Sequence, residues 1–128
     1  MTQQRSKISY TVGALSANTI TTNNLDVTTA TIGQTVNATT AVNLPASCGI
    51  ITTQALSTAT SGSTSFAINH SNIAVGKIII AQISSYGGNG LPSVYVSGVN
   101  TTTANLVIRN SHRDAPLNAT MGISYIIL

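Results

Sequence analysis

Charged side chains are the scarcest feature of this sequence. Only 5% of its 128 residues are Asp, Glu, Lys or Arg, whereas charged residues make up about a quarter of a typical soluble domain. The acidic residues are Asp26 and Asp114, and there is no Glu. General acid–base catalysis needs positioned titratable groups, and these two carboxylates lie in separate parts of the chain. The sequence therefore predicts a protein that is not an enzyme and that binds no cofactor.

The cations are too few and too scattered to predict a nucleic-acid surface. The formal net charge is +3, Trp is absent and Phe66 is the only Phe. A nucleic-acid footprint needs a patch of several cations, so we expect no nucleic-acid partner. The cations nearest the N-terminus either contact an acidic surface or simply solvate that part of the chain. The five cations are Arg5, Lys7, Lys77, Arg109 and Arg113.

Cysteine pairs and long apolar runs are also absent. Cys48 is the only cysteine, so we expect no disulfide within the chain, and its expected role is that of a small buried residue. No run approaches the roughly 18 apolar residues that a membrane span needs. The first ten residues, MTQQRSKISY, do not contain the apolar core of a signal peptide. We therefore expect no membrane partner.

Thr and Asn, with widely spaced aliphatic residues, fill the stretch from Leu15 to Thr40. The aliphatic residues of this stretch do not recur with the period of a helix or with the alternation of a regular amphipathic strand. We interpret the stretch as an extended β segment that buries its aliphatics against copies of itself or against another protein. The alternative is a low-complexity linker, but flexible linkers favour Gly and Ser, and Gly33 is the only Gly between residues 14 and 48. The aliphatics are Leu15, Ile20, Leu25, Val27, Ile32 and Val36.

Residues 1–14 are predicted to be a polar arm, and in their sequence Ile8, Tyr10 and Val12 alternate with polar residues. Such a pattern fits a short strand added to the sheet edge of a partner. These three residues and the six aliphatics of the Thr-rich stretch are the expected assembly interface. Pro45 cannot sit in a central strand, and it marks the expected boundary. The predicted organisation is an arm over 1–14, an extended Thr-rich β segment over 15–46 and a compact knob over 47–128.

The knob is predicted to be a small antiparallel β-sandwich, because short β-rich runs alternate with turn signals such as Gly-Gly-Asn-Gly. This makes the chain all-β and its knob jelly-roll-like. The strand that begins KIIIA has a continuous apolar start, which predicts burial on both faces. The final YIIL predicts a central strand or a strand between subunits. The expected strands cover 50–56, 64–69, 77–86, 93–99, 104–110 and 118–128.

Few residues suggest chemistry. His70, His112 and Asp114 form the one polar trio worth testing, but no third metal ligand accompanies the two histidines, and we expect no metal site. The Gly87–Leu91 and Ser111–Leu117 loops are expected to meet at one end of the sandwich. Their planar and polar side chains suit contact with carbohydrate or protein, although two ordinary hairpin loops would look the same. The candidate ligand contacts are Tyr86, Asn89, His112 and Arg113.

Both halves of the chain resemble viral structural proteins of the fibre and capsid-decoration type, especially those of tailed bacteriophages. TITTNNLDVTTATIG is similar to the β-structured shafts of trimeric phage fibres. NHSNIAVGKIIIAQISSYGGNGLPSVYVSGVN, the DAPLNAT loop and the ISYIIL ending are similar to the small β-sandwich knobs of such proteins. The resemblance implies a homotrimer on the virion, with the N-terminal arm on the shell and the knob outward.

The expected function is therefore that of a capsid decoration or cement protein on the capsid surface of a virion. It would bind and stabilise the viral shell as a homotrimer, with the major capsid protein or another virion protein as its partner. The alternative is a receptor-binding fibre tip or adhesin that recognises a glycan or protein on the host cell surface. A third and more distant alternative is a small hydrolase or a lectin-like metal protein.

Overall fold

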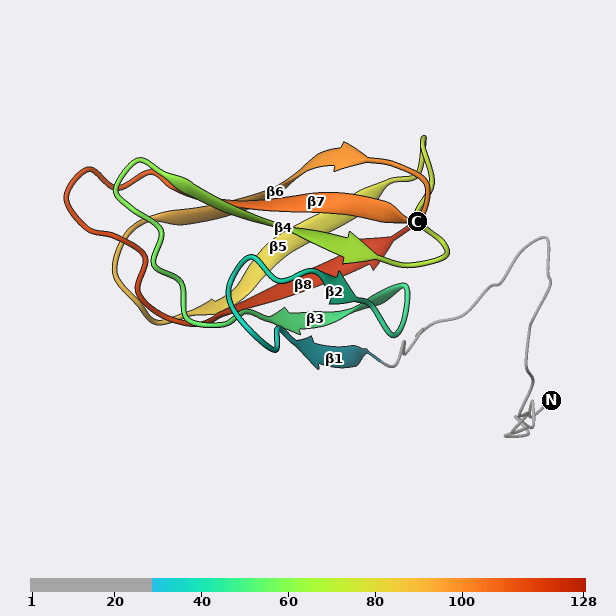
Figure 1. Cartoon of the computed structure of the whole chain (residues 1–128), viewed down its shortest axis with the longest axis horizontal. Coiled ribbons are helices and arrows are strands. Elements are labelled where there is room, and N and C mark those ends of the chain that lie inside the picture. The colour runs from blue at the N-terminus through green and yellow to red at the C-terminus, as the bar shows by residue number, and fades with distance from the viewer. Residues whose placement is uncertain (1–28) are drawn as a thin grey trace, which may run out of the picture.

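Two four-stranded β-sheets packed face to face form the part of the chain described in the computed structural model, residues 29–128 (Figure 1). No helix occurs within these residues, so the predicted all-β class is confirmed. Sheet A has the order β1 (Ala30–Gly33), β3 (Cys48–Thr52), β8 (Met121–Ile127) and β5 (Ile79–Tyr86). Sheet B has the order β2 (Val42–Asn43), β4 (Ser63–Asn69), β7 (Thr103–Asn110) and β6 (Pro92–Val99).

The strands from β3 to β8 form a two-stranded antiparallel ribbon that is folded over on itself. Strand β3 pairs with β8 and β4 pairs with β7, both antiparallel, while the ribbon turns back between β5 and β6. Folding the ribbon over brings β5 beside β8 in sheet A and β6 beside β7 in sheet B, which gives the expected jelly-roll-like sandwich. The sheets are mixed rather than purely antiparallel, because β1 runs parallel to β3 and β2 runs parallel to β4.

The sandwich begins upstream of the boundary expected at residue 46. Strands β1 and β2 both lie in the segment 15–46, and each forms one edge of a sheet. Val42 and Leu44 are buried in the common core, so this part of the segment serves the fold of its own chain. Pro45 therefore lies in the turn between β2 and β3 and does not separate two domains. The expected arm and residues 15–28 lie outside the described residues.

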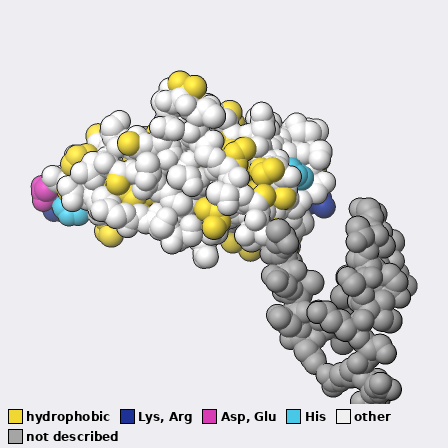
Figure 2. Space-filling model, turned by 90° about the horizontal axis from the view of Figure 1, so that it is seen from below, with side chains coloured by type: hydrophobic (Ala, Val, Ile, Leu, Met, Phe, Trp, Pro, Cys, Tyr) yellow, Lys and Arg dark blue, Asp and Glu magenta, His cyan; other side chains and the backbone are white. Residues whose placement is uncertain are grey.

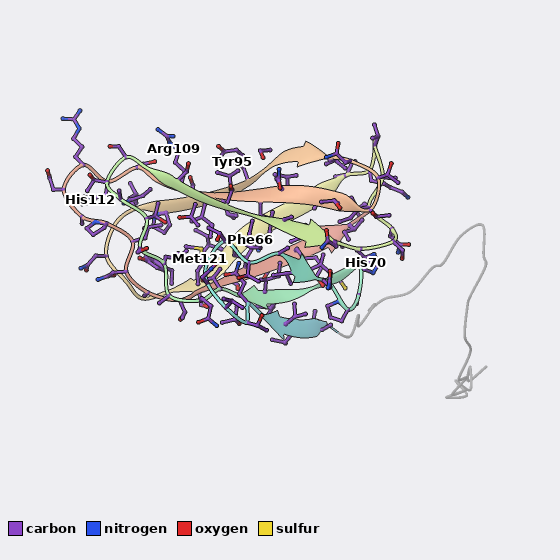
Figure 3. All side chains as sticks on the ribbon, in the orientation of Figure 1. Phe66, His70, Tyr95, Arg109, His112 and Met121 are labelled. Carbon is purple, nitrogen blue, oxygen red and sulfur yellow. The ribbon has the colours of Figure 1, made fainter. Side chains whose placement is uncertain are left out.

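The core forms where the inner faces of the two sheets meet. In sheet A, Ile51 lies opposite Ile123 and both are fully buried. In sheet B, Phe66 lies opposite Leu106, and both are buried against the same core. Figure 3 shows Phe66 between the sheets. Burying one such side chain contributes roughly 1.5–3 kcal/mol before conformational entropy is lost, so this layer is the main source of stability.

The six expected strands are present, with differences of a few residues at their ends. As predicted, β8 is a central strand, with β3 and β5 on either side. The prediction that the apolar start of β5 is buried on both faces was wrong. Strand β5 is an edge strand of sheet A, and Ile78 and Ile80 are 61% and 50% exposed. Ile79, Ala81 and Ile83, which alternate with them, pack against the core.

A register shift in β6 changes which face of the strand one residue occupies. Val94 and Val96 pack against the core, and the pairing with β7 is interrupted between Val96 and Gly98. A β-bulge of this kind adds one residue to a strand and reverses the side-chain alternation beyond it. Val99 therefore packs against the core, although simple alternation places it on the opposite face.

Candidate functional site

Three loops meet at one end of the sandwich: the β3–β4 connection, the β5–β6 connection and the β7–β8 connection (Figure 1). The loop that follows β5 reaches the loop that follows β7 through a hydrogen bond from Ser111 N to Leu91 O, 2.9 Å long. The β3–β4 loop joins them where Leu117 N donates to Thr58 O at 2.9 Å. The structure thus brings together the two loops that the sequence placed at one end, and adds a third.

Asn110, the last residue of β7, holds these loops together and is completely buried. Its side-chain Oδ1 accepts hydrogen bonds from the backbone N–H groups of Leu91 and His112, each at 3.0 Å. Its Nδ2 donates to the carbonyl oxygens of Ala115 at 2.8 Å and Ala59 at 3.2 Å. One amide therefore makes four hydrogen bonds that reach all three loops. Sequence reasoning missed Asn110 because nothing in its local pattern distinguishes it from the many other Asn residues.

Tyr86 and Asn89, two of the expected ligand contacts, shape the loops themselves, Tyr86 through its hydroxyl and Asn89 through its backbone N–H and carbonyl groups. The Tyr86 hydroxyl donates to the Asn89 carbonyl oxygen at 2.6 Å and accepts from Asn118 N–H at 3.1 Å. Asn118 Oδ1 in turn accepts from Asn89 N–H at 2.7 Å. Gly88 is enclosed by this ring, since a Cβ there would lie 2.5 Å from the Tyr86 hydroxyl oxygen. Gly90 has a φ of +89°, a backbone conformation that favours glycine.

His112, a third expected contact, also serves its own loop. Its Nδ1 accepts from Asp114 N–H at 3.0 Å and Ala115 N–H at 2.9 Å. Arg113, the fourth, is exposed beside it. The four residues therefore gather at one end, as expected, but three of them are engaged in hydrogen bonds that shape the loops. No pocket opens among the loops in the described part of the chain.

The trio of His70, His112 and Asp114 is not assembled. His70 and His112 lie at opposite ends of the sandwich (Figure 3), and within residues 29–128 no three His, Cys, Asp or Glu side chains are placed to hold a metal ion. The Nδ1 of His70 accepts from Asn72 N–H at 3.0 Å, a local turn contact like that of His112. The trio thus provides no candidate metal or catalytic centre.

An exposed apolar surface on sheet A is the clearest unpaired feature of the described residues. Ile80 lies directly opposite Ile126, and Leu128 N donates to Ile78 O at 2.8 Å, so the four side chains adjoin on two neighbouring strands. We call these four residues the sheet A patch. The exposed fractions are 61% for Ile78, 50% for Ile80, 38% for Ile126 and 57% for Leu128.

The patch faces outward because side chains alternate along both strands. Tyr125 and Ile127 flank Ile126 in β8, and both are buried in the core, which leaves Ile126 on the opposite face. Cys48 of β3 pairs with Ile126 and extends the same row toward β1. The repeated Ile in KIIIA and YIIL is visible in the sequence, but the exposure of these side chains depends on the position of β5 at the edge of sheet A.

Tyr125 lies beneath this surface, on the inner side of β8. Its hydroxyl donates to the Ala46 carbonyl oxygen at 2.9 Å. Burial raises the pKa of the Tyr125 phenol above its ordinary value, and the neighbouring Cys48 thiol raises that pKa further. The phenol is therefore held in its neutral, hydrogen-bonded form, and it ties β8 to the turn before β3.

Charged side chains are confined to few positions on the described surface. They are Lys77, Arg109, Arg113 and Asp114. On the face seen in Figure 2 the coloured charges lie at the two ends, and the flank between them carries only uncoloured and hydrophobic side chains. Apolar contacts along such a flank require little desolvation of charge.

The expected assembly residues divide into three groups. Ile32 is partly buried and packs against the core of its own sandwich. Val36 is 74% exposed on the β1–β2 connection. The remaining residues lie outside the described part of the chain: Ile8, Tyr10, Val12, Leu15, Ile20, Leu25 and Val27.

Comparison with protein-family models, with curated proteins and with solved structures gave no match to this chain. Residues 29–128 include no helix long and apolar enough to cross a membrane. The loop end and the sheet A patch are therefore the two surfaces from which a function can be inferred.

Proposed function

We propose that this chain is a capsid decoration protein, a virion structural protein that binds and stabilises the viral shell as a homotrimer. The observation that carries the proposal is the sheet A patch on a sandwich with only four charged side chains among its described residues. Exposed contiguous apolar surface marks interaction sites on soluble proteins. A protein that works by association needs such a surface and needs no pocket.

The physical basis of attachment is burial of sparse aliphatic side chains at many equivalent contacts. Each fully buried Ile, Leu or Val contributes roughly 1.5–3 kcal/mol before ordering costs. A single chain with few such residues binds weakly, but a trimer presents every contact three times, and linked contacts raise the overall affinity without any new interaction. The uncharged polar surface around the aliphatics adds hydrogen bonds without long-range repulsion between copies.

A receptor-binding fibre tip is the second candidate, and the loop end favours it. Three loops are fixed there by buried Asn110, and Leu91 and Arg113 are exposed beside them. A pre-organised end of this kind lowers the ordering cost of binding a glycan or protein. This candidate places the contact at the opposite end of the sandwich from the sheet A patch.

The test compares the full-length protein with a variant in which Ile80 and Ile126 of the sheet A patch are replaced by Ser. Mass in solution is measured by light scattering, and binding is measured by co-sedimentation with capsids that lack the protein. We expect the full chain to be a trimer that sediments with capsids, and the Ile80 and Ile126 variant to remain folded but stay in the supernatant. A full chain that is monomeric both in solution and on capsids would overturn the proposal. Binding of both forms to host cells, without capsid binding, would favour the fibre tip.

A further inference from the structure

A third surface, the outer face of sheet B, carries an exposed aromatic side chain. Tyr95 of β6 is 47% exposed, and it faces away from the core because Val94 and Val96 on either side of it pack inward. Figure 3 shows Tyr95 and Arg109 projecting from sheet B on the side away from sheet A. We call this surface the sheet B face. It consists of Ser63 and Ser65 of β4, Ser93 and Tyr95 of β6, and Asn105, Val107 and Arg109 of β7.

Val107 supports the Tyr95 side chain from below. It lies directly opposite Tyr95 on β7, and it points away from the core because its neighbours Leu106 and Ile108 are buried there. Even so, only 8% of Val107 is exposed, so side chains of the same face must cover it. Tyr95 is the largest side chain directly across from it. The Tyr95 ring therefore packs over an apolar support and presents its remaining surface to solvent.

Two polar side chains flank this ring along β7. Asn105 and Arg109 lie two residues before and two residues after Val107, so all three share one side of the strand. Both polar side chains are exposed. Each is a diagonal neighbour of Tyr95 across the strand pair, about 7–8 Å away. An amide and a guanidinium thus stand on either side of the ring, at a spacing that a sugar ring with its substituents can bridge.

Small hydroxyl side chains fill the rest of the sheet B face. Ser63 and Ser93 lie on either side of Arg109, and Ser65 lies beside Val107. Interfaces between proteins contain little Ser and have an apolar centre, which a face with one exposed ring does not offer. A saccharide suits the face better. Its hydroxyls exchange hydrogen bonds with Ser and Asn, and the C–H groups on one side of a sugar ring pack on an aromatic ring.

The charge of the sheet B face favours an acidic saccharide. Arg109 is its only charged residue, and Asp114, the only carboxylate side chain within residues 29–128, lies in the connection after β7. A guanidinium forms paired hydrogen bonds with a carboxylate. We propose that the sheet B face binds a saccharide that carries a carboxylate, with Tyr95 against the sugar ring and Arg109 paired with the carboxylate.

This site goes beyond the capsid decoration proposal and is compatible with it. The outer faces of sheets A and B lie on opposite sides of the sandwich (Figure 1), so a chain held through the sheet A patch leaves the sheet B face free. The site is also separate from the loop end. A single shallow face binds a sugar weakly, with an expected Kd in about the millimolar range, and several copies held together raise the overall affinity.

NMR titration of the isotope-labelled full-length chain tests the proposal. The acidic probes are trigalacturonate and sialyllactose, and their uncharged counterparts are the methyl ester of trigalacturonate and lactose. We expect the acidic probes to shift backbone amide signals of β6 and β7. We also expect them to bind about tenfold more tightly than the uncharged counterparts, which lack the charge-assisted hydrogen bonds to Arg109.

Two variants and two matched controls assign the contacts. Arg109→Gln and Tyr95→Ser should each weaken binding of the acidic probes about tenfold or more. Lys77→Gln removes an equal charge, and Val75→Ser removes an apolar side chain that is 77% exposed, both from the connection before β5. These controls should change the affinity less than about twofold. Arg109→Gln should leave binding of the uncharged probes unchanged, whereas Tyr95→Ser should weaken it. The amide spectrum of each variant shows whether it is folded.

Three results would overturn the proposal. Absence of shifts with both acidic probes at about 10 mM would exclude the saccharide and leave a protein as the expected partner of this face. Equal weakening by Arg109→Gln and Lys77→Gln would show general attraction to positive charge without a site. Shifts confined to the loops around Asn110 would place the sugar at the loop end. No capsid is present in these measurements, so their failure differs from failure of the decoration proposal.

Discussion

The two ends of the sandwich use their side chains in opposite ways. At the loop end, Asn110, Tyr86 and Asn118 make hydrogen bonds to neighbouring loops, and these polar groups have partners within the chain. At the other end, the sheet A patch exposes apolar side chains that have no cover within residues 29–128. The loop end is held rigid by internal hydrogen bonds, whereas the sheet A patch leaves apolar side chains exposed.

This contrast makes the sheet A patch a better candidate for binding than the loop end. A conspicuous cluster of Tyr, Asn and His suggests a ligand site, but here the cluster supplies the internal framework of three loops. A row of Ile and Leu suggests a core, but here the row lies outside. Polar groups that are already satisfied gain little from a ligand, whereas exposed apolar side chains gain from any partner that removes them from water.

The largest expected effect is at the loop end. Replacing Asn110 with Ala removes four hydrogen bonds and leaves buried backbone groups without partners, each at a cost of about 1–3 kcal/mol. We expect the free energy of unfolding to fall by roughly 3 kcal/mol or more. Asn105→Ala, an exposed change on the same strand, is the control. Urea unfolding measures both, and equal stability of the two variants would show that the amide is not the centre of the loop end.

The next largest effect on stability is expected at two adjacent glycines, Gly87 and Gly88. Gly88→Ala forces a methyl group against the Tyr86 hydroxyl and Asn118 Oδ1, which lie 2.5 and 2.6 Å from the Cβ position. We expect a loss of about 1–3 kcal/mol, typical of overpacking. At Gly87 a Cβ meets nothing within 4 Å, so Gly87→Ala should be neutral or slightly stabilising. Thermal melts of the two variants should therefore differ, and coincident melts would contradict the packing around Gly88.

A smaller effect concerns Tyr125, next to the patch. Its pKa is raised in the folded state, so above the ordinary phenol pKa of about 10 the unfolded chain loses the proton first. The contribution of this phenol to the free energy of unfolding is fully present below about pH 10. It is lost as pH rises through the raised folded-state pKa. We expect unfolding free energy to decline less with alkaline pH in Tyr125→Phe than in the unchanged chain. Parallel pH profiles would argue against a buried phenol.

The smallest effect on stability is expected at the patch itself. In a chain without residues 1–28, Ile80→Ser should change the free energy of unfolding by about 0.5 kcal/mol or less, as surface substitutions usually do. Ile83→Ser, on the inner side of the same strand, should cost about 2 kcal/mol or more. Urea unfolding compares the two. A large cost at Ile80 would mean that the patch is already buried by described residues.

Local pattern was sufficient to predict most of the fold. The strands from residue 48 onward follow from alternation and from glycine-rich turns, and the meeting of the loops near Asn89 and Asn118 follows from antiparallel connections. The position of β5 at a sheet edge does not follow, because it depends on which distant strands pair. For the same reason local pattern does not predict the parallel pairing of β1 with β3, which joins residues before Pro45 to the sandwich.

The candidate site was predictable only in part. Tyr86, Asn89, His112 and Arg113 do share one end, since strand ends that share a side of a sandwich bring their loops together. The role of Asn110 depends on burial, and burial depends on the packing of three loops that are far apart in the sequence. The sheet A patch required the strand order, because the same Ile-rich run reads as core in a central strand and as surface in an edge strand.

The central position of β8 has a consequence for the order of folding during synthesis. Strand β8 is the last strand along the chain, and it holds β3 and β5 on either side. A chain leaving the ribosome can bring β4, β6 and β7 together as part of sheet B while β3 and β5 still lack their shared neighbour. Their unpaired edges and inward-facing Ile51 and Ile83 stay exposed until β8 emerges, so a nascent chain that pauses before residue 121 is the species most prone to aggregate.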